Sequence, residues 1–141
     1  MSNQDLGIYG EQLVQDWLTH QGWEILYRRW HCRWGELDIV AQGYNAQGGK
    51  LSSQILTFVE VKTRSTGSWD AGGRMAIALP KQIKLSRTAA MFLATFPEKA
   101  DYSCRFDVAI VCCERKITLS NSLASLSAQG LYLMLQEYIP A

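Results

Sequence analysis

The segment 55–64, ILTFVEVKTR, is the feature that most narrows the fold of this chain. Its β-branched and aromatic residues predict a buried β-strand. Because strand side chains alternate between two faces, Glu60 and Lys62 point the same way, together with Phe58. A carboxylate and an ammonium on one face suit a site that acts on one small group, such as a phosphate or the water of a metal ion. For this segment alone, a solvated strand face with alternating charges is the alternative.

The length of 141 residues suits one domain with a core, so we expect a single domain over 1–141. No apolar run reaches the roughly 18 residues that a membrane span needs. The N-terminal residues MSNQDLGIYGEQ lack the basic and apolar regions of a signal peptide. A cytoplasmic protein without a membrane partner is therefore expected.

The cysteines argue against a zinc site, and the net charge argues against a surface that is basic as a whole. Cys32, Cys104, Cys112 and Cys113 contain no C-x-x-C pair, which favours reduced thiols over a zinc site. The formal net charge is only +1, so any binding of nucleic acid must depend on local clusters of basic residues.

Residues 6–21 have the apolar spacing of an amphipathic helix. Asn3 or Asp5 is expected to cap its start, and Gly22 to end it. Glu11 lies at the margin of the apolar stripe. Its carboxylate is either solvated or directed along the edge of the packed face towards a site, and the pattern leaves both open.

Residues 23–33 predict a strand whose end is crowded with basic and aromatic side chains. These are Arg28, Arg29, His31 and Arg33, interleaved with Tyr27, Trp30 and Trp34. Cations beside aromatic rings suit phosphate contact and base stacking, although ordinary strand surfaces show the same mixture. His31 has no second histidine at metal-ligand spacing, so we interpret it as a surface or phosphate-contact residue.

A second strand, GELDIVAQ, begins at Gly35 and places Glu36 and Asp38 on one face, with Leu37 and Ile39 on the other. The glycine-rich stretch 43–54 predicts a hairpin loop, which makes this strand an antiparallel neighbour of 55–64. Asp38 is then expected close to Glu60. Carboxylates that share a face are unfavourable unless a cation neutralises them, so the pattern predicts a metal site.

The remaining residues complete an α/β pattern. Residues 65–79 predict an irregular loop near the site, without a phosphate-binding P-loop. A helix is expected from Pro80 to about Phe96. Its core side is formed by Ala89, Phe92, Leu93 and Phe96. The basic residues Lys81, Lys84 and Arg87 lie on its other sides. A buried strand follows over 104–113, with Arg105 and Asp107 as a structural ion pair. An exposed loop or hairpin over 114–130 and a final strand over 131–139 end the chain.

This order resembles the PD-(D/E)xK nuclease superfamily, which includes archaeal-type Holliday junction resolvases and restriction endonucleases. More closely, the chain resembles the YraN-type family of small uncharacterised bacterial proteins over about residues 7–113. The matching residues are Gly7, Gly10, Glu11, 22–26 (GWEIL), 33–40 (RWGELDIV), 58–64 (FVEVKTR), Lys81 and 105–108 (RFDV). The long loop 41–54, Val14 in place of the usual Ala, and the segment after Cys113 depart from the family pattern.

The resemblance implies a restriction-endonuclease-like αβββαβ core over about 6–113, with a mixed central sheet flanked by helices and a C-terminal extension, 114–141. It implies that Asp38, Glu60 and the main-chain carbonyl of Val61 bind Mg²⁺ or Mn²⁺. Lys62 would orient or deprotonate the attacking water and stabilise the transition state. Glu11 and Glu36 would be outer carboxylates. The residues expected to hold the phosphate backbone are Arg28, Arg29, Arg33, Arg64, Lys81 and Lys84.

The expected function is that of a metal-dependent endonuclease acting on DNA, with branched DNA as one candidate substrate. Two alternatives remain open: a nucleic-acid-binding protein with little or no nuclease activity, and an assembly protein with a structural acidic face. A junction resolvase would act as a symmetric homodimer, for which Trp30, Trp34 and Trp69 are candidate contact residues.

Overall fold

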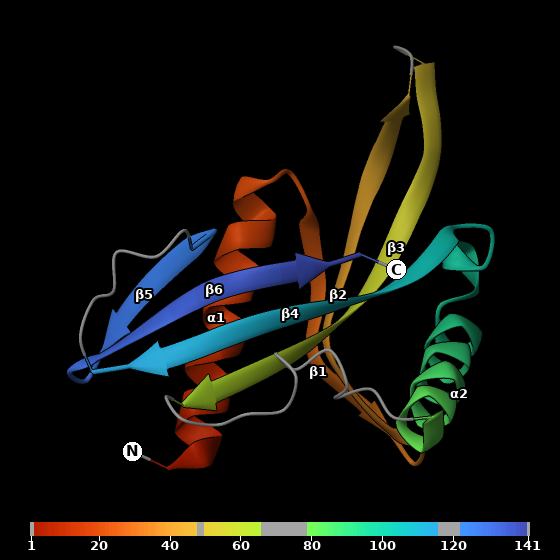
Figure 1. Cartoon of the computed structure of the whole chain (residues 1–141). Helices are drawn as coiled ribbons and strands as arrows, with labels where there is room; N and C mark the ends of the chain where they lie inside the picture. Colours follow the sequence, from red (N-terminus) through yellow and green to blue (C-terminus); the bar gives the residue numbers. More distant parts are fainter. Residues whose placement is uncertain (1, 48–49, 66–78, 116–121, 141) are drawn as a thin grey trace.

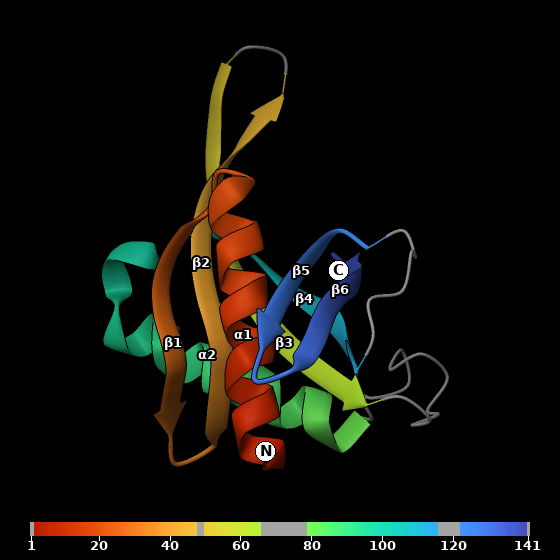
Figure 2. The ribbon, with the colours of Figure 1, turned by 90° about the vertical axis from the view of Figure 1, so that its left-hand side faces the viewer.

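A six-stranded mixed sheet with one helix on each face forms the described part of the chain (Figures 1 and 2). The computed structural model describes residues 2–47, 50–65, 79–115 and 122–140. The elements are α1 (Asn3–His20), β1 (Glu24–Cys32), β2 (Gly35–Gln47), β3 (Lys50–Ser65), α2 (Leu79–Thr95), the 3-10 helix η2 (Pro97–Lys99), β4 (Ser103–Glu114), β5 (Ala124–Ala128) and β6 (Leu131–Ile139).

The strands lie in the order β1-β2-β3-β4-β6-β5. The pairs β1–β2 and β2–β3 are antiparallel, and β4 is parallel to β3. A parallel pair needs a crossover connection, and the segment that contains α2 provides it. The predicted αβββαβ order and the mixed sheet are confirmed.

The N-cap of helix α1 is one residue before Asn3, the first of the two residues that were expected to cap it. Ser2 is the N-cap, and its hydroxyl accepts a hydrogen bond from the Asp5 N–H at 3.2 Å while the Asp5 carboxylate accepts one from the Ser2 N–H. Asp5 is therefore the reciprocal partner in a capping box and not the cap itself. Gly22 follows the helix with φ +98°, which confirms the predicted end.

The two helices divide the core into two layers. Leu13, Val14 and Leu18 of α1 pack on one face of the sheet, against residues that include Ile39 and Val59. The residues of α2 that cover the other face are Leu85, Ala89 and Phe92, together with the partly buried Leu93 and Phe96. The predicted core side of α2 is confirmed.

Two segments, one predicted as a hairpin loop and one as an exposed loop or hairpin, contain paired strands. Over 43–54, β2 and β3 remain paired as far as Gln47 and Lys50, with a register shift between Tyr44 and Ala46. They form a two-stranded arm that extends beyond the rest of the sheet (Figure 1). Within 114–130, β5 pairs with β6 through the turn Gln129–Gly130, whose φ angles of +50° and +77° are typical of a tight hairpin. Most of the expected loop 65–79, including Trp69, lies outside the described residues.

The Arg105–Asp107 ion pair is present at 3.1 Å and anchors the C-terminal strand. The carboxylate of Asp107 also accepts hydrogen bonds from the hydroxyls of Thr57 (2.7 Å) and Tyr138 (2.6 Å). Burial, and then Asp107, raise the pKa of Tyr138 far above its usual value. The network therefore joins β3, β4 and β6.

The four cysteines form no disulfide, as predicted. Neither helix in the described part of the chain has the length and hydrophobicity that crossing a membrane requires.

Candidate functional site

The sheet is irregular at Asp38. Pairing between β2 and β3 begins where Ile39 lies opposite Val59. Ahead of that point, Leu37 packs in the core layer of α2, whereas Ile39 packs in the layer of α1. The prediction that Leu37 and Ile39 share a face is therefore wrong, because the backbone changes its alternation at Asp38. At this point the Asp38 carboxylate, rather than a main-chain carbonyl of β2, accepts a hydrogen bond from the Val61 N–H of β3 at 2.9 Å.

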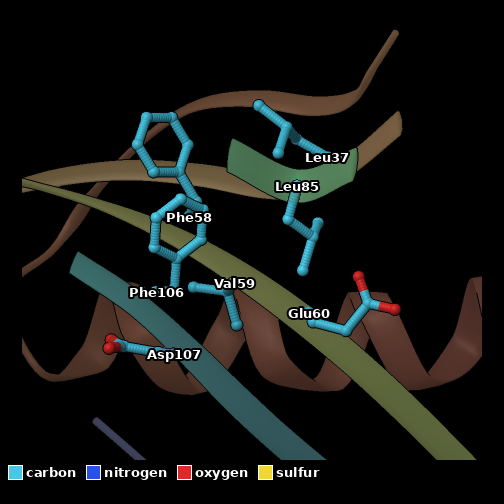
Figure 3. A pocket seen from close by; sticks show the side chains of 7 residues that line it. All are labelled: Leu37, Phe58, Val59, Glu60, Leu85, Phe106 and Asp107. Atoms are coloured by element: carbon cyan, nitrogen blue, oxygen red, sulfur yellow. The ribbon is translucent and has the colours of Figure 1, made fainter. Parts of the chain in front are cut away.

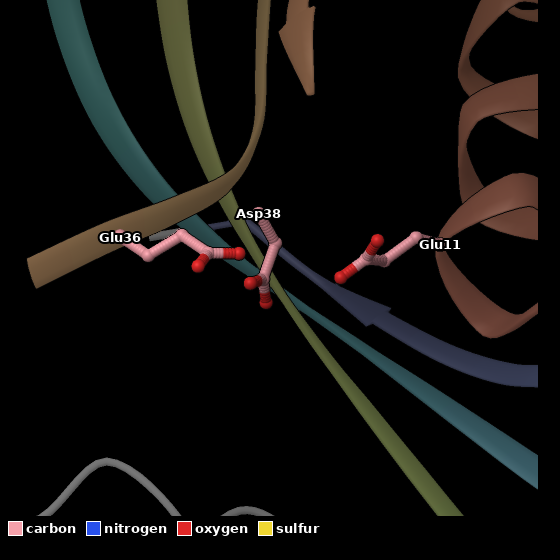
Figure 4. A group of neighbouring side chains, drawn as sticks. All are labelled: Glu11, Glu36 and Asp38. Carbon is pink, nitrogen blue, oxygen red and sulfur yellow. The ribbon is translucent and has the colours of Figure 1, made fainter. Parts of the chain in front are cut away.

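Three carboxylates converge at this irregularity. One oxygen each of Glu11, Glu36 and Asp38 lies within 4.8 Å of the other two. Figure 4 shows Glu11 reaching in from α1, with Asp38 between it and Glu36 of β2. Glu11 is buried, with 6 % of its surface exposed, whereas Glu36 is exposed and Asp38 half-buried. We call these three residues the carboxylate cluster, and it opens to solvent at Glu36.

Gly10 explains how Glu11 reaches the site. A Cβ at this position would overlap with Oγ1 of Thr63 in β3. The backbone of α1 can therefore approach β3 this closely only because residue 10 has no side chain. The next residue, Glu11, is carried to the sheet as a consequence.

Glu60 and Lys62 lie on the same side of β3, as the strand alternation predicts. Nζ of Lys62 is 3.2 Å from Oε1 of Glu60, and both side chains are largely buried. Glu60 also lines a small pocket, with Leu37, Phe58, Val59, Leu85, Phe106 and Asp107. Figure 3 shows its carboxylate turned away from the phenyl rings of that pocket.

The electrostatics of the site centre on Asp38. Burial, and then the negative charge of Glu60, raise the pKa of Asp38 to about 7, although the Val61 N–H acts in the opposite direction. Glu11 raises this pKa further, and a hydrogen bond links Asp38 with Glu60. The expected proximity of Asp38 and Glu60 is confirmed. At neutral pH, Asp38 is therefore protonated in about half of the molecules, and a bound cation would favour its charged form.

Arg28 and Arg29, two of the predicted phosphate-binding arginines, contact Glu11. Nε of Arg29 lies 2.8 Å from Oε2 of Glu11. Arg28 is 3.5 Å from the same oxygen and donates shorter hydrogen bonds to the side chains of Gln12 (2.9 Å) and Gln15 (3.1 Å). Glu11, and more weakly Glu36 and Asp38, raise the pKa of Arg29. The sequence pattern missed these contacts because nothing in it indicates that β1 meets α1 at Glu11.

Of the other predicted phosphate contacts, Arg33, Arg64 and Lys84 have described side chains. The guanidinium groups of Arg33 and Arg87 lie 4.7 and 5.1 Å from the centre of the exposed Trp34 ring. Lys84 is exposed on α2, and Arg64 is half-buried near the end of β3. Lys81 belongs to α2, but its side chain lies outside the described part. The exposed His31 lies opposite Glu36 in the β1–β2 pairing, and its Nδ1 is 3.2 Å from the Arg29 carbonyl oxygen. Binding of phosphate by any of these residues stays a prediction.

The donor set fits a hard divalent cation. Three carboxylate oxygens converge on one point, and Mg²⁺ and Mn²⁺ prefer such ligands. The structure brings Glu11 and Glu36 to Asp38, whereas Glu60 lies beside that group and pairs with Lys62. For Val61 the structure shows a role of its N–H towards Asp38, and coordination by its carbonyl stays a prediction.

Comparisons with known proteins give a family. Residues 10–111 match the "Uncharacterised protein family UPF0102". A "UPF0102 protein" of Trichormus variabilis is 49 % identical over 148 residues, covering 100 % of this chain and 95 % of that protein. "UPF0102 protein alr1796" of a Nostoc species is 51 % identical over 142 residues, with the same coverage. A third, of Trichodesmium erythraeum, is 44 % identical over 155 residues, covering 96 % of this chain and 86 % of that protein. These names state no activity.

Proposed function

The chain belongs to the UPF0102 family, and we propose that it is a metal-dependent endonuclease that hydrolyses phosphodiester bonds of DNA. The observation that carries this proposal is the convergence of Glu11, Glu36 and Asp38 beside the Glu60–Lys62 pair. A cluster of carboxylates next to a lysine suits the hydrolysis of an anionic ester, because such a reaction needs both positive charge on the phosphate and an activated water.

The carboxylate cluster would hold Mg²⁺ or Mn²⁺. The bound cation would supply positive charge that stabilises the phosphate oxygens as the reaction proceeds. The hydrogen bond from the Val61 N–H fixes the orientation of the Asp38 carboxylate, so this ligand is preorganised by the backbone of β3.

Lys62 would act on the attacking water and the phosphate, and Glu60 would position the neighbouring side chains. The ion pair at 3.2 Å holds the Lys62 ammonium in place at the edge of the carboxylate cluster. There Nζ of Lys62 would orient the attacking water and donate a hydrogen bond to a phosphate oxygen as negative charge increases. Glu60, linked to both Asp38 and Lys62, keeps these two side chains in register.

A substrate with unpaired nucleotides fits the surface beside the site. Trp34 forms the β1–β2 turn with Arg33, two residues before Glu36, and 37 % of its surface is exposed. An exposed indole next to two guanidinium groups suits stacking on a base together with contact to the neighbouring phosphates. We therefore include flaps and junctions among the substrates. A symmetric dimer, which paired cuts would need, stays a prediction.

A specific contact favours a second candidate function. Arg28 and Arg29 already neutralise Glu11, so the fold tolerates the carboxylate cluster without a cation. A nucleic-acid-binding protein on a nuclease fold, with little or no turnover, is compatible with this arrangement. Loss of binding with added salt, without cleavage, would be its signature.

The test is cleavage of labelled single-stranded, duplex, flap and four-way-junction DNA with Mg²⁺, Mn²⁺ or chelator. We expect metal-dependent cleavage by the wild type and a loss of at least about 100-fold in Glu60→Gln and Lys62→Met, as for removal of one transition-state-stabilising group. Glu98→Gln, an exposed carboxylate in η2, is the matched control and should cleave like the wild type. Cleavage in chelator, or equal rates in all variants, would contradict the proposal.

A further inference from the structure

Arg29 has an unusual backbone for the interior of a strand. Its φ is +54°, in the left-handed region that residues with a side chain rarely adopt. Such a conformation costs free energy and persists where its surroundings require it. Here it accompanies the ion pair between Arg29 and the buried Glu11.

The guanidinium of Arg29 lies in the field of the whole carboxylate cluster. It contacts Glu11 at 2.8 Å, and one oxygen of Glu11 lies within 4.8 Å of oxygens of Glu36 and Asp38. Arg28 differs, because its shortest contacts are with Gln12 and Gln15. Arg29 is therefore the arginine that is tied most directly to the carboxylates.

We propose that Arg29 is a built-in competitor of the divalent cation: it neutralises the carboxylate cluster when no cation is bound, and it leaves Glu11 when a cation binds. This inference rests on the proposed metal site. Two positive groups next to the same carboxylates repel each other, so each lowers the affinity of the site for the other. Arg29 thereby sets the cation concentration at which the site becomes loaded.

The geometry permits this exchange. The Arg29 side chain is 38 % exposed, so its guanidinium has access to solvent, whereas the Glu11 side chain is only 9 % exposed. The carboxylate thus stays in place while the arginine is free to turn outward. The Arg28 contacts with Gln12 and Gln15 do not involve Glu36 or Asp38 and need not change.

The experiment is calorimetric titration of the metal-free protein with Mn²⁺. Arg29→Asn removes the charge but keeps a residue that tolerates a left-handed backbone. Arg29→Lys keeps the charge, and Arg115→Asn removes an exposed arginine that follows β4. We expect Arg29→Asn to bind Mn²⁺ about tenfold more tightly than the wild type, as for loss of one like charge close to the site. Arg29→Lys and Arg115→Asn should stay within about twofold of the wild type.

The outcomes separate this inference from the proposed function. Tighter Mn²⁺ binding by Arg29→Asn than by the wild type supports competition. Mn²⁺ binding by Arg29→Asn without any binding by the wild type supports it most strongly. If the wild type binds Mn²⁺ and Arg29→Asn binds it equally or more weakly, competition is refuted while the metal site stands. If neither protein binds Mn²⁺, both the metal site and the competition are refuted. Circular dichroism establishes that each variant is folded.

Discussion

At the scale of single residues, the site depends on one close contact and one perturbed carboxyl group. Gly10 lets α1 approach Thr63, which places Glu11 beside Asp38. Asp38 in turn is fixed by a main-chain N–H and carries a raised pKa. Both features concern atoms that lie far apart in the sequence.

We predict that Gly10→Ala lowers the free energy of unfolding by about 1–3 kcal/mol, although alanine favours helices, because its methyl group overlaps with Thr63. The effect should be smaller in a Thr63→Ala background, where Oγ1 is absent. Urea denaturation of the two single variants and the double variant measures this coupling. Equal losses in both backgrounds would mean that the contact does not limit the approach of α1.

The pH dependence of stability follows from Asp38. Its pKa in the folded protein is about 7, above the ordinary value of 3.8, so the folded state binds the proton more tightly than the unfolded state. Stability of the metal-free protein should therefore fall as pH rises from about 4 to about 7, and Asp38→Asn should remove this contribution. Melting temperatures in chelator between pH 4 and 8 measure it. Parallel curves for wild type and variant would contradict the assignment.

At the scale of elements, the β1–β2 turn carries the surface that we assign to unpaired nucleotides. We predict that Trp34→Ala weakens binding of a single-stranded oligonucleotide by about 1–3 kcal/mol, as for loss of one stacked base, and changes duplex binding much less. Fluorescence anisotropy in the presence of chelator measures both affinities. Trp23→Phe is the control, because Trp23 contacts Arg105 and Gly43, away from the turn. A uniform loss on all substrates would indicate a general phosphate contact.

Most elements could be predicted from the sequence because their signals are local. The alternation in ILTFVEVKTR and the apolar spacing of α1 and α2 each depend on neighbouring residues, and all three elements were predicted within a few residues. The change of alternation at Asp38 could not be predicted, since it depends on the pairing of three strands. The contact of Arg29 with Glu11 depends on how α1 crosses β1. The β2–β3 arm was missed because glycine and serine suggest a loop, although strand pairing continues through them.

At the scale of the whole molecule, the two strands β5 and β6 that follow Glu114 are part of the sheet. Strand β6 pairs with β4, and its Leu133 and Leu135 are fully buried. The expected C-terminal extension, 114–141, therefore contributes β5 and β6 to the sheet. The sequence carried only a weak strand signal there, because Gln129–Gly130 is not one of the strongest turn sequences.

We predict that truncation after Glu114 prevents folding, because it removes the strand that covers β4. A milder change, Tyr138→Phe, should lower the free energy of unfolding by about 1–3 kcal/mol, since the buried Asp107 loses the 2.6 Å hydrogen bond from the Tyr138 hydroxyl. Chemical denaturation of Tyr138→Phe and circular dichroism of the truncated chain provide the measurements. A folded truncated chain would show that β1–β4 form an independent unit.

The most direct test of the central claim is anomalous diffraction from crystals of the wild-type protein soaked in Mn²⁺. We predict an anomalous peak among the carboxylate oxygens of Glu11, Glu36 and Asp38, and its loss in Asp38→Asn crystals soaked in the same way. A peak at another position, or no peak among these residues at saturating Mn²⁺, would contradict the assignment of the carboxylate cluster as the metal centre of a nuclease.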